Sequence, residues 1–532
     1  MNKQVYLDVV LQQVPRLLGL IDRNPLSPTF GCADRQFWHY KVVDFPAARF
    51  QESCLTLALL YTLDHPKNPY FKNKLMLQWS KAVINFWVNM QRSDGSFDEW
   101  YPFEHSFVAS AFSAAAVAEA LLVFPELQSP EVMRALERVG NFLLKSSEVR
   151  VQNQLTGALL ALYNIFLLTK NPLYEKGFLE KLAVLEKLQS SEGWFAEYGG
   201  VDVGYLSLAV DYLGKLFDKS RSMDVLVMAE KAVNFLHAVL HPDGSFGGVY
   251  ASRNTEYCIP AGVELLPSAT AASLAYHIRK SLARNAVISP ASLDDRYVAY
   301  IMYTYLQAFI AGKDNVEPLS RSKATQFFPH AGLIVQQVPF FFLLNVHKGG
   351  AFRAVFKDRV LLDAGIQVRT KKSRLFSGYM QPVVSVPVND KVAIEGYLVH
   401  TTSTLMSPLK MLLLHGFQMA VGRFGFFSTW LKSLLRDVLI QGKQKSKIRF
   451  RREVSYTPQL QVVDTLFNVP PCRIILGGKA SYNAVPSSKY FQQSELDSIP
   501  VEVVVHKHAS VKIIRAYGKD GVLVSAPEVV VF

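Results

Sequence analysis

Three turns in the first half of the chain place acids, aromatic rings and glycines directly before apolar stretches. They read QRSDGSFDEWYP from Gln91, LQSSEGWFAEYGG from Leu188 and LHPDGSFGGVYAS from Leu240. Aromatic faces pack well on flat, partly apolar ligands, and carboxylates and amides form hydrogen bonds with hydroxyl groups. We therefore predict a carbohydrate-binding surface, made by residues of these turns and the stretches that follow them: Trp100, Glu104, Trp194, Glu197, Tyr198, Arg253, Asn254 and Glu256.

Two further groups of residues are candidates for catalysis or sugar binding, and each also has a structural interpretation. His105 stands beside Glu104 at the start of an apolar stretch, where catalysis and helix capping are both consistent with the sequence. The stretch CADRQFWHYKVVDF contains Arg35, Trp38 and His39, which can line a sugar subsite or close the fold.

The elements that must position these residues begin with helices. From Asn2 to about Gln326 apolar residues recur at helical spacing, as in FVASAFSAAAVAEALLVF. The acids of the three turns, Asp94, Glu192 and Asp243, are 98 and 51 residues apart, and NFLLKSSEVRVQNQ, halfway along the longer interval, fits a further turn. A unit of roughly 50 residues holds two helices and their connections, and such units stack into solenoids or rings. We predict an α/α toroid over residues 1–326 with the turns on one face.

From Phe327 onward the residue pattern changes to short runs that alternate apolar and polar residues or are rich in β-branched residues, such as QPVVSVPV and VEVVVHKHASVKIIRAYG. A period of two residues indicates strands with one buried face. We predict an antiparallel β-sandwich over residues 327–532, which makes the chain an α+β protein of two domains. Its length and its content of 50% hydrophobic and 19% charged residues fit a folded protein and exclude a disordered one.

Three local patterns resemble the heparinase II/III-like proteins, a family of polysaccharide lyases and uronyl C5-epimerases with a toroid followed by a sandwich. VQNQLTGALLALYNIF is similar to the family's Asn-His helix start, with Asn153 at the amide position and Gln154 where many members have histidine. EGWFAEYGGVDVGYLSLAVDYL places Tyr205 at the catalytic tyrosine. NVHKGGAFRAVFKDRVLLDAG puts His347 nearest to the family's strand histidine, with shorter spacing and without the usual aspartate.

The resemblance implies removal of the C5 proton of a uronic acid, which requires that the neighbouring carboxylate be neutralised as charge develops. Asn153, helped by Gln154, can hold that carboxylate. Tyr205, made acidic by nearby cations, and His347 are the candidate bases, and His105 is a further catalytic candidate. Loss of the oxygen at C4 gives elimination, whereas return of a proton to the opposite face gives epimerisation. No metal or cofactor is expected.

One segment of the predicted sandwich has a different pattern. Residues 407–452 combine long apolar faces with scattered cations. The ten Lys and Arg residues between Thr401 and Leu460 contribute much of the formal net charge of +13. We interpret 407–452 as an inserted amphipathic helical segment that lies on an anionic membrane surface, with helices packed on the sandwich as the alternative. The start of the chain has no basic region followed by an apolar core, and the four separated cysteines fit buried thiols. We therefore expect a cytoplasmic protein on the inner face of the cell membrane.

Two other functions remain open. An inverting glycoside hydrolase needs two carboxylates at the separation that admits a water molecule, and Glu99, Glu197, Asp202 and Glu256 are candidates. A membrane-associated polysaccharide-binding or assembly protein without catalysis is consistent with Gln154 and the altered histidine strand. No nucleic-acid module is recognisable, so we expect an acidic polysaccharide and no nucleic acid as partner.

Overall fold

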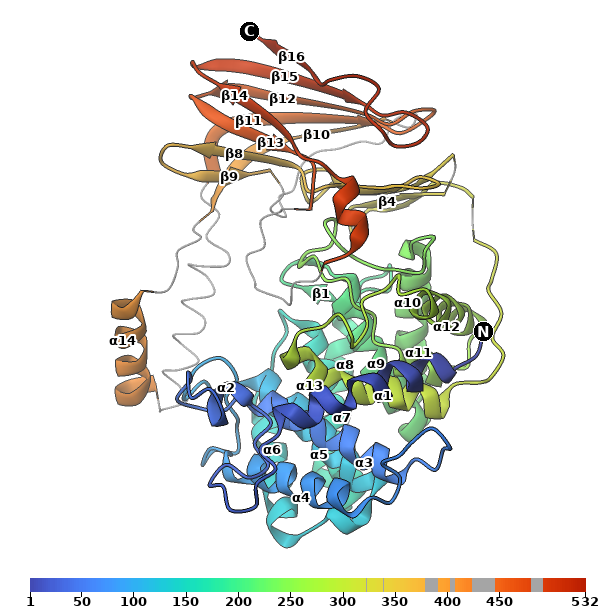
Figure 1. Cartoon of the computed structure of the whole chain (residues 1–532), viewed down its shortest axis with the longest axis vertical. Coiled ribbons are helices and arrows are strands. Elements are labelled where there is room, and N and C mark those ends of the chain that lie inside the picture. The colour runs from blue at the N-terminus through green and yellow to red at the C-terminus, as the bar shows by residue number, and fades with distance from the viewer. Residues whose placement is uncertain (322, 338, 378–390, 402–406, 423–444, 480–490) are drawn as a thin grey trace.

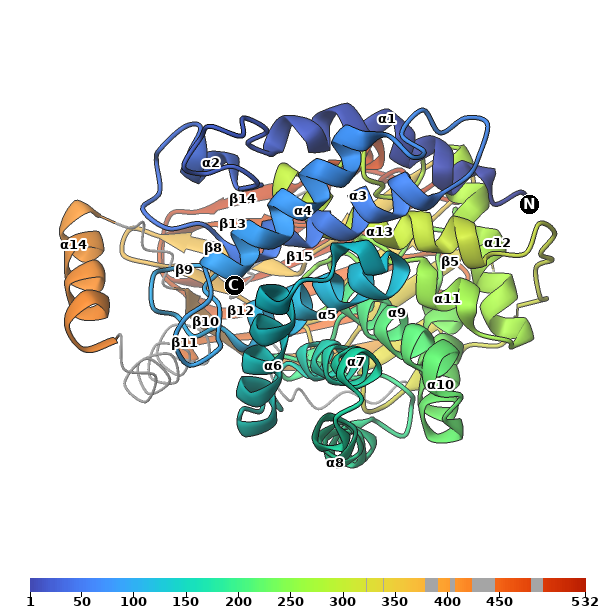
Figure 2. The ribbon, with the colours of Figure 1, turned by 90° about the horizontal axis from the view of Figure 1, so that it is seen from below.

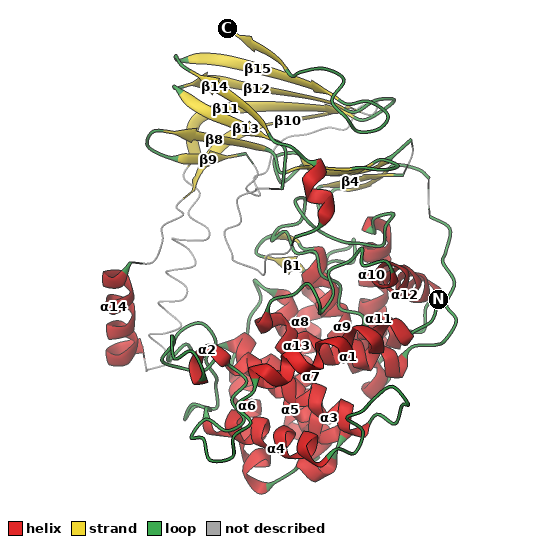
Figure 3. Ribbon diagram, in the orientation of Figure 1, coloured by secondary structure: helices red, strands yellow, loops and turns green. Residues whose placement is uncertain are grey.

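The computed structural model describes residues 1–532 except 322, 338, 378–390, 402–406, 423–444 and 480–490. Helices occupy the N-terminal part and antiparallel sheets the C-terminal part, as predicted (Figures 1 and 3). The last helix of the N-terminal part ends at Ala311, and the first strand of the sheets begins at Gln326.

Six helices form an inner layer that closes on itself. Each contacts the next in the order given, and the last contacts the first. Their apolar residues lie on all sides, as the poly-alanine centre of the FVASAFSAAAVAEALLV helix illustrates, so nearly every residue of that helix is buried. The inner helices are α3 (Ser53–Thr62), α5 (Phe107–Val123), α7 (Gln152–Thr169), α9 (Val203–Ser220), α11 (Ala261–Leu265) and α13 (Asp295–Ala311).

An outer layer of amphipathic helices covers this ring (Figure 2). In α6, for example, Val132, Leu136, Val139 and Leu143 are buried on one face. The outer helices are α1 (Gln4–Leu20), α4 (Lys74–Asn89), α6 (Pro130–Lys145), α8 (Pro172–Leu188), α10 (Met223–Val239) and α12 (Ala269–Ala283), and the short helices are α2 (Arg35–Trp38), η1 (Ala48–Glu52) and η2 (Pro125–Leu127).

The repeated turns have a common packing role. Gly95 and Gly193 have φ of +90° and +98° and lie against the backbone of α6 and α10, where a Cβ would come within 2.3 Å of a carbonyl oxygen. A glutamine before each turn donates to its glycine's carbonyl, Gln91 at 3.1 Å and Gln189 at 2.9 Å. Each turn therefore leads from one outer helix to an inner one and fixes the next outer helix in place.

Two antiparallel sheets follow, and a short hairpin of β1 (Ala196–Glu197) and β2 (Gly200–Val201) belongs to the helical part. The five-stranded sheet has the order β3 (Gln326–Phe328), β4 (Leu333–Gln336), β5 (Phe341–Asn345), β6 (Ala351–Val355) and β7 (Val360–Asp363). The nine-stranded sheet has the order β14 (Val501–Val505), β13 (Cys472–Leu476), β8 (Ile366–Thr370), β9 (Arg374–Phe376), β10 (Lys391–Thr401), β11 (Lys445–Ser455), β12 (Gln461–Val469), β15 (Ala509–Ala516) and β16 (Glu528–Val531).

The five-stranded sheet is a middle layer. On β5, Phe341 and Leu343 belong to the core of the helical part, whereas Phe342 and Leu344 belong to the core shared with the nine-stranded sheet. Successive side chains of a strand point to opposite faces, so one apolar run is buried on both sides. The sheets pack face to face, and the inner one docks on the helices.

A buried ion-pair network joins the two sheets. Arg452 pairs with Asp464 at 2.6 Å and with Asp363 at 2.9 Å, and Arg515 pairs with both aspartates at 2.8 Å. The two arginines hold the pKa of the Asp363 carboxyl below its usual range. Removal of one partner would leave a buried charge uncompensated.

The predicted inserted segment is only partly helical, and its C-terminal boundary is wrong. Helix α14 (Pro408–Phe417) and a π-helical turn (Gln418–Gly422) begin it, and residues 423–444 lie outside the described residues. Residues 445–452 belong to β11, where Phe450 and Arg452 are buried. The strand's alternation was hidden in the sequence because one buried position is an arginine.

Helix α14 stands apart from the sheets (Figure 1) and has no buried residue. Leu409, Leu412 and Leu413 are 65%, 69% and 64% exposed. Among the described residues, no helix has the length and apolar content to cross a membrane. All four cysteines are buried and unpaired, as predicted.

Candidate active site

Four residues distant in the sequence meet where inner helices α7 and α9 begin. Asn153 lies in the first turn of α7, and Tyr205 lies in the first turn of α9. Glu197 comes from β1, and Arg253 from the loop between α10 and α11. The alternating outer and inner helices bring these starts to one end of the ring.

The carboxylate of Glu197 is held at both oxygens. One accepts from the Arg253 Nη1 at 2.8 Å, and the other accepts from the Asn153 amide. The carboxyl is almost fully buried, and burial raises its pKa to about 7 although Arg253 and Asn153 oppose the shift. Asn153 is therefore no helix cap, because its side chain binds a carboxylate.

Tyr205 lies against Arg253, with 4.4 Å between the guanidinium carbon and the ring centre. Its hydroxyl is 3.3 Å from the hydroxyl of Tyr297 on α13. Burial raises the pKa of Tyr205 well above its usual value, and Arg253 acts in the opposite direction. The expectation of an acidified tyrosine is wrong, because desolvation outweighs the cation.

Asp202 fixes the geometry of these groups. Its carboxylate caps α9 through the Tyr205 N–H at 3.1 Å and accepts the Arg253 N–H at 2.9 Å. The N–H and the hydroxyl of Thr255 also donate to it. One carboxylate thus ties the start of α9 to the loop that carries Arg253.

A row of rings and guanidinium groups continues from Tyr205 toward solvent. Tyr297 packs against Tyr300 with ring centres 4.9 Å apart, and Arg49 lies 3.9 Å from the centre of the Tyr300 ring. At the outer end, Arg296 lies 4.1 Å from the centre of the Trp100 indole, which is 58% exposed. Trp100 is the exposed end of this row, whereas Tyr297, Tyr300 and Arg49 are buried and Arg49 is paired with Glu52 at 2.6 Å.

The sheets hold the Arg253 loop from the other side. Lys348 Nζ donates to the Ala251 carbonyl and to Asn254 Oδ1. Asn345 donates to the Tyr250 carbonyl at 2.8 Å. The middle sheet is therefore part of the structure that positions Arg253.

Lys479 bonds Glu256 at 2.6 Å and Glu495 at 2.7 Å, which links the helical part to the segment before β14. Glu256 and Asn254, both predicted to bind substrate, thus bond to lysines of the sheet region.

The histidine candidates have other surroundings. The His347 ring lies against Gly332, and burial lowers the pKa of its imidazole. His105 bonds Asp94 at 2.6 Å and Ser96 at 3.0 Å in the first repeated turn. Glu104 accepts the N–H groups of Glu99 and Trp100 in the same loop.

The remaining candidates divide by location. The guanidinium carbon of Arg253 lies 5.5 Å from the centre of the Tyr198 ring, so Tyr198 belongs to the same cluster as Tyr205 and Arg253. Gln154 is half-buried on α7 beside Asn153. Trp194 donates to Glu192 at 2.9 Å, and that carboxylate accepts the N–H groups of residues 330 and 331 before β4.

The N-terminal group forms a cluster of its own around α2. Arg35 lies 5.1 Å from the Tyr40 ring centre, Trp38 donates to the Leu20 carbonyl, and His39 contacts Trp38. Of the two interpretations of this group, these contacts favour the one in which its residues close the fold.

Sequence reasoning missed the residues of α13 and η1: Arg49, Arg296, Tyr297 and Tyr300. The stretch DDRYVAYIMYTYL carries tyrosines three residues apart, a spacing that places side chains on one helical face. This row of tyrosines on one helical face was the feature of the sequence from which these residues could have been predicted.

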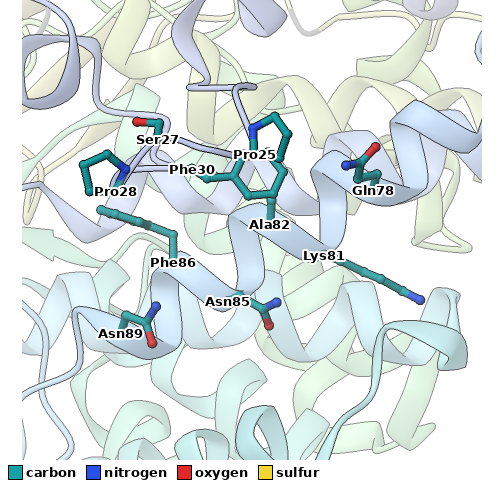
Figure 4. A pocket seen from close by; sticks show the side chains of 10 residues that line it. All are labelled: Pro25, Ser27, Pro28, Phe30, Gln78, Lys81, Ala82, Asn85, Phe86 and Asn89. Carbon is teal, nitrogen blue, oxygen red and sulfur yellow. The ribbon is translucent and has the colours of Figure 1, made fainter.

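A hollow of about 530 Å³ lies elsewhere, between the loop after α1 and helix α4 (Figure 4). Its lining includes Phe30, Gln78, Lys81 and Asn85 and no member of the Tyr205 cluster.

The closed ring of helices with antiparallel sheets docked on it is also the architecture of a solved polysaccharide lyase. The chondroitin AC lyase of Streptomyces coelicolor A3, solved with chondroitin sulphate, shares it at 11% sequence identity and a TM-score of 0.56, over 90% of this chain and 69% of the lyase.

Heparinase III (10% identity, TM-score 0.43, 99% of this chain and 95% of that one) and a glycosyl hydrolase family 88 protein from Bacteroides vulgatus (10%, 0.38, 58% and 99%) match less well. No protein-family model matches the sequence, and no curated protein matches it. The likeness establishes the fold.

Proposed function

We propose that the chain is an enzyme that acts on a uronic-acid-containing polysaccharide by removing the proton at C5. The observation that carries the proposal is a tyrosine ring packed against a guanidinium that, together with an amide, holds a carboxylate. Asn153 and Arg253 bind the Glu197 carboxylate at both oxygens, and Tyr205 lies against the same Arg253. The shared fold of a chondroitin lyase supports this chemistry.

In the proposed reaction, Asn153 and Arg253 hold the substrate carboxylate as it gains charge. Donors placed where charge develops are the largest single contribution in many enzymes. The phenolate of Tyr205 takes the C5 proton, and the nearby Arg253 charge stabilises that phenolate. Because the pKa of Tyr205 is raised, the phenolate is a minor form at neutral pH and a strong base.

Elimination and C5-epimerisation share this first step. Elimination breaks the bond from C4 to its oxygen and leaves an unsaturated sugar, whereas epimerisation returns a proton to the opposite face of C5. A role in making or remodelling an acidic surface polymer fits both.

Hydrolysis is the second candidate and has weaker support. Asp202 accepts four hydrogen bonds at the start of α9, and Glu256 pairs with Lys479. Glu197 is likewise bound by Asn153 and Arg253, so each of these three carboxylates considered for hydrolysis has protein partners. A binding protein without catalysis is the third candidate, and Gln154 in place of histidine is its main support.

One experiment separates these functions. The full chain is incubated in deuterated water with chondroitin, heparosan and polymannuronate, and C5 exchange and ultraviolet absorbance are followed. Elimination gives absorbance, epimerisation gives deuterium at C5 without absorbance, and hydrolysis gives new reducing ends alone. Absence of exchange and of absorbance with every polymer would overturn the proposal.

We also propose that α14 rests on an anionic membrane surface at the inner face of the cell membrane. Its exposed leucines and Met411 are unusual for a surface helix, and cations are frequent in the sequence that follows. Arg449 and Arg451 pair with Glu395 on the sheet, which reduces the charge available to lipid. The apolar contact should therefore dominate.

A further inference from the structure

Glu197 occupies the two donors that the proposed reaction assigns to the substrate carboxylate. The inference rests on the proposed function. A uronate carboxylate needs the Asn153 amide and the Arg253 guanidinium, yet both already bond to Glu197.

The backbone of Glu197 is fixed at the site. Its backbone belongs to β1, which pairs with β2 and forms a bridge with Val151 at the start of α7. Its carbonyl accepts from Ser252 at 3.0 Å, and its side chain is buried. A substrate carboxylate at the same donors would therefore lie beside the Glu197 carboxyl.

The charged groups around Glu197 determine how unfavourable it is to place a second carboxylate beside it. The groups facing Glu197 are Asn153 from α7, Arg253 from the loop, Asp202 and Tyr205 from α9, and beyond Tyr205 the hydroxyl of Tyr297 from α13. Arg253 is the cation among them, and Tyr198 stacks on it.

Asp202 accepts four hydrogen bonds, which favour its charged form, although burial raises the pKa of its carboxyl. A second carboxylate would thus share one guanidinium with Glu197, and like charges so close in a buried site are strongly unfavourable.

We propose that Glu197 is a specificity-determining residue that substitutes for the substrate carboxylate in the empty site, and that a uronate takes its two donors as the protein binds one proton. The proton comes from solvent and neutralises the Glu197 carboxylate. The resulting acid group donates its O–H to the incoming uronate, so the net charge of the site stays constant.

Two consequences separate Glu197 from an ordinary binding residue. Neutral sugars lack the carboxylate that displaces it, so they leave the Arg253 pair intact and bind without proton uptake. The raised pKa of Glu197, about 7, places the proton uptake near neutral pH, where a normal glutamate would already be ionised.

The test uses the full chain carrying Tyr205→Phe, which should slow turnover strongly, and calorimetric titration with chondroitin, heparosan and polymannuronate tetrasaccharides. Measurement in buffers of different ionisation enthalpy gives the protons bound. We expect about one proton taken up per uronate oligosaccharide at pH 8, little at pH 6, and a Kd that rises by about tenfold per pH unit well above 7.

Glu197→Gln in the same background should abolish the uptake and make Kd independent of pH from 6 to 8. Glu264→Gln is the matched control, because Glu264 is also a buried glutamate paired with an arginine, Arg279, at 2.6 Å. It should leave the proton uptake unchanged.

The outcomes distinguish the two proposals. Binding of uronate oligosaccharides without proton uptake and with a constant Kd overturns the role of Glu197 and leaves the proposed function standing. Binding of no uronate oligosaccharide at either pH overturns both. The proton count with Glu197 in place decides the matter even if the glutamine variant does not fold.

Discussion

The Tyr205 ring lies beneath the guanidinium of Arg253, with 4.4 Å between the guanidinium carbon and the ring centre. The two residues come from the start of α9 and from the loop after α10, and Asp202 bonds to the backbone N–H of both. A cation in this position favours the phenolate over the phenol, which burial opposes. The pair therefore sets how strong a base the tyrosine is.

Tyr205→Phe should lower kcat by about 10²- to 10⁴-fold, the usual contribution of a proton-transfer group. The ring and its contact with Arg253 remain, so the midpoint of thermal unfolding should change little. Turnover of uronate polymer and thermal unfolding are measured side by side. Tyr212→Phe, on the same helix, is the control and should keep its activity; retention of most activity by Tyr205→Phe would remove Tyr205 from the mechanism.

Asn153→Ala should lower kcat/KM by about 10²-fold, because the amide matters most as charge develops on the carboxylate. Asn164→Ala is the control, since Asn164 is a buried asparagine on the same helix that bonds Glu119. Steady-state kinetics and urea unfolding are measured for both variants. If Asn153→Ala loses stability alone, its side chain is structural.

Glu197 should make the protein less stable as the pH rises. The ordinary pKa of 4.5 is raised to about 7 in the folded state, so the folded protein binds the proton more tightly than the unfolded chain does. The stabilisation is complete below pH 4.5 and is lost as pH rises to 7, by about 3 kcal/mol. The free energy of unfolding is measured in urea for the wild type and for Glu197→Gln at pH 5 and pH 8. The wild type should lose stability relative to the variant between pH 5 and pH 8. A constant difference would mean an unperturbed carboxyl.

Lys348→Met should weaken both stability and catalysis. The buried ammonium bonds Ala251 and Asn254, and the loss leaves their oxygens without this donor, at a cost of about 1–3 kcal/mol. Because the same loop carries Arg253, kcat should also fall. Lys391→Met removes an exposed lysine that pairs with Glu453 and should change neither quantity by much. A stability loss with unchanged kcat would show that the sheets hold the loop without affecting Arg253.

The double substitution Leu409→Asp and Leu412→Asp should release the protein from anionic vesicles. Burial of apolar surface stabilises by about 25 cal/mol per Å², and an aspartate removes that contribution and adds repulsion. Vesicle flotation is measured at low and high salt. Leu173→Asp with Leu179→Asp on α8, where both leucines are about half exposed, is the matched control. A wild-type chain that ignores anionic vesicles at low salt would show that α14 has another role.

The local structure could be predicted from the residue pattern. Helical and two-residue periods located the change from helices to strands near residue 326, because each period reflects which side chains face the core. The glycines of the turns marked positions where a Cβ would strike the neighbouring helix. Asn153 and Tyr205 were predicted from the resemblance of two local patterns to motifs of a known family. Residues 445–452 were misread because a buried ion pair put arginine at a core position of a strand.

Tertiary structure decided which of the candidates meet. Glu197 is 44 residues from Asn153 and 56 from Arg253, and only closure of the helical ring brings these positions together. The same closure brought Tyr297 to Tyr205 and left His105 bound to its own turn. The raised pKa values of Glu197 and Tyr205 arise from burial, which is a property of the packed ring and sheets. The spacing of residues in the sequence does not show how far water is excluded from a site. The pKa values at this site therefore depend on the tertiary fold.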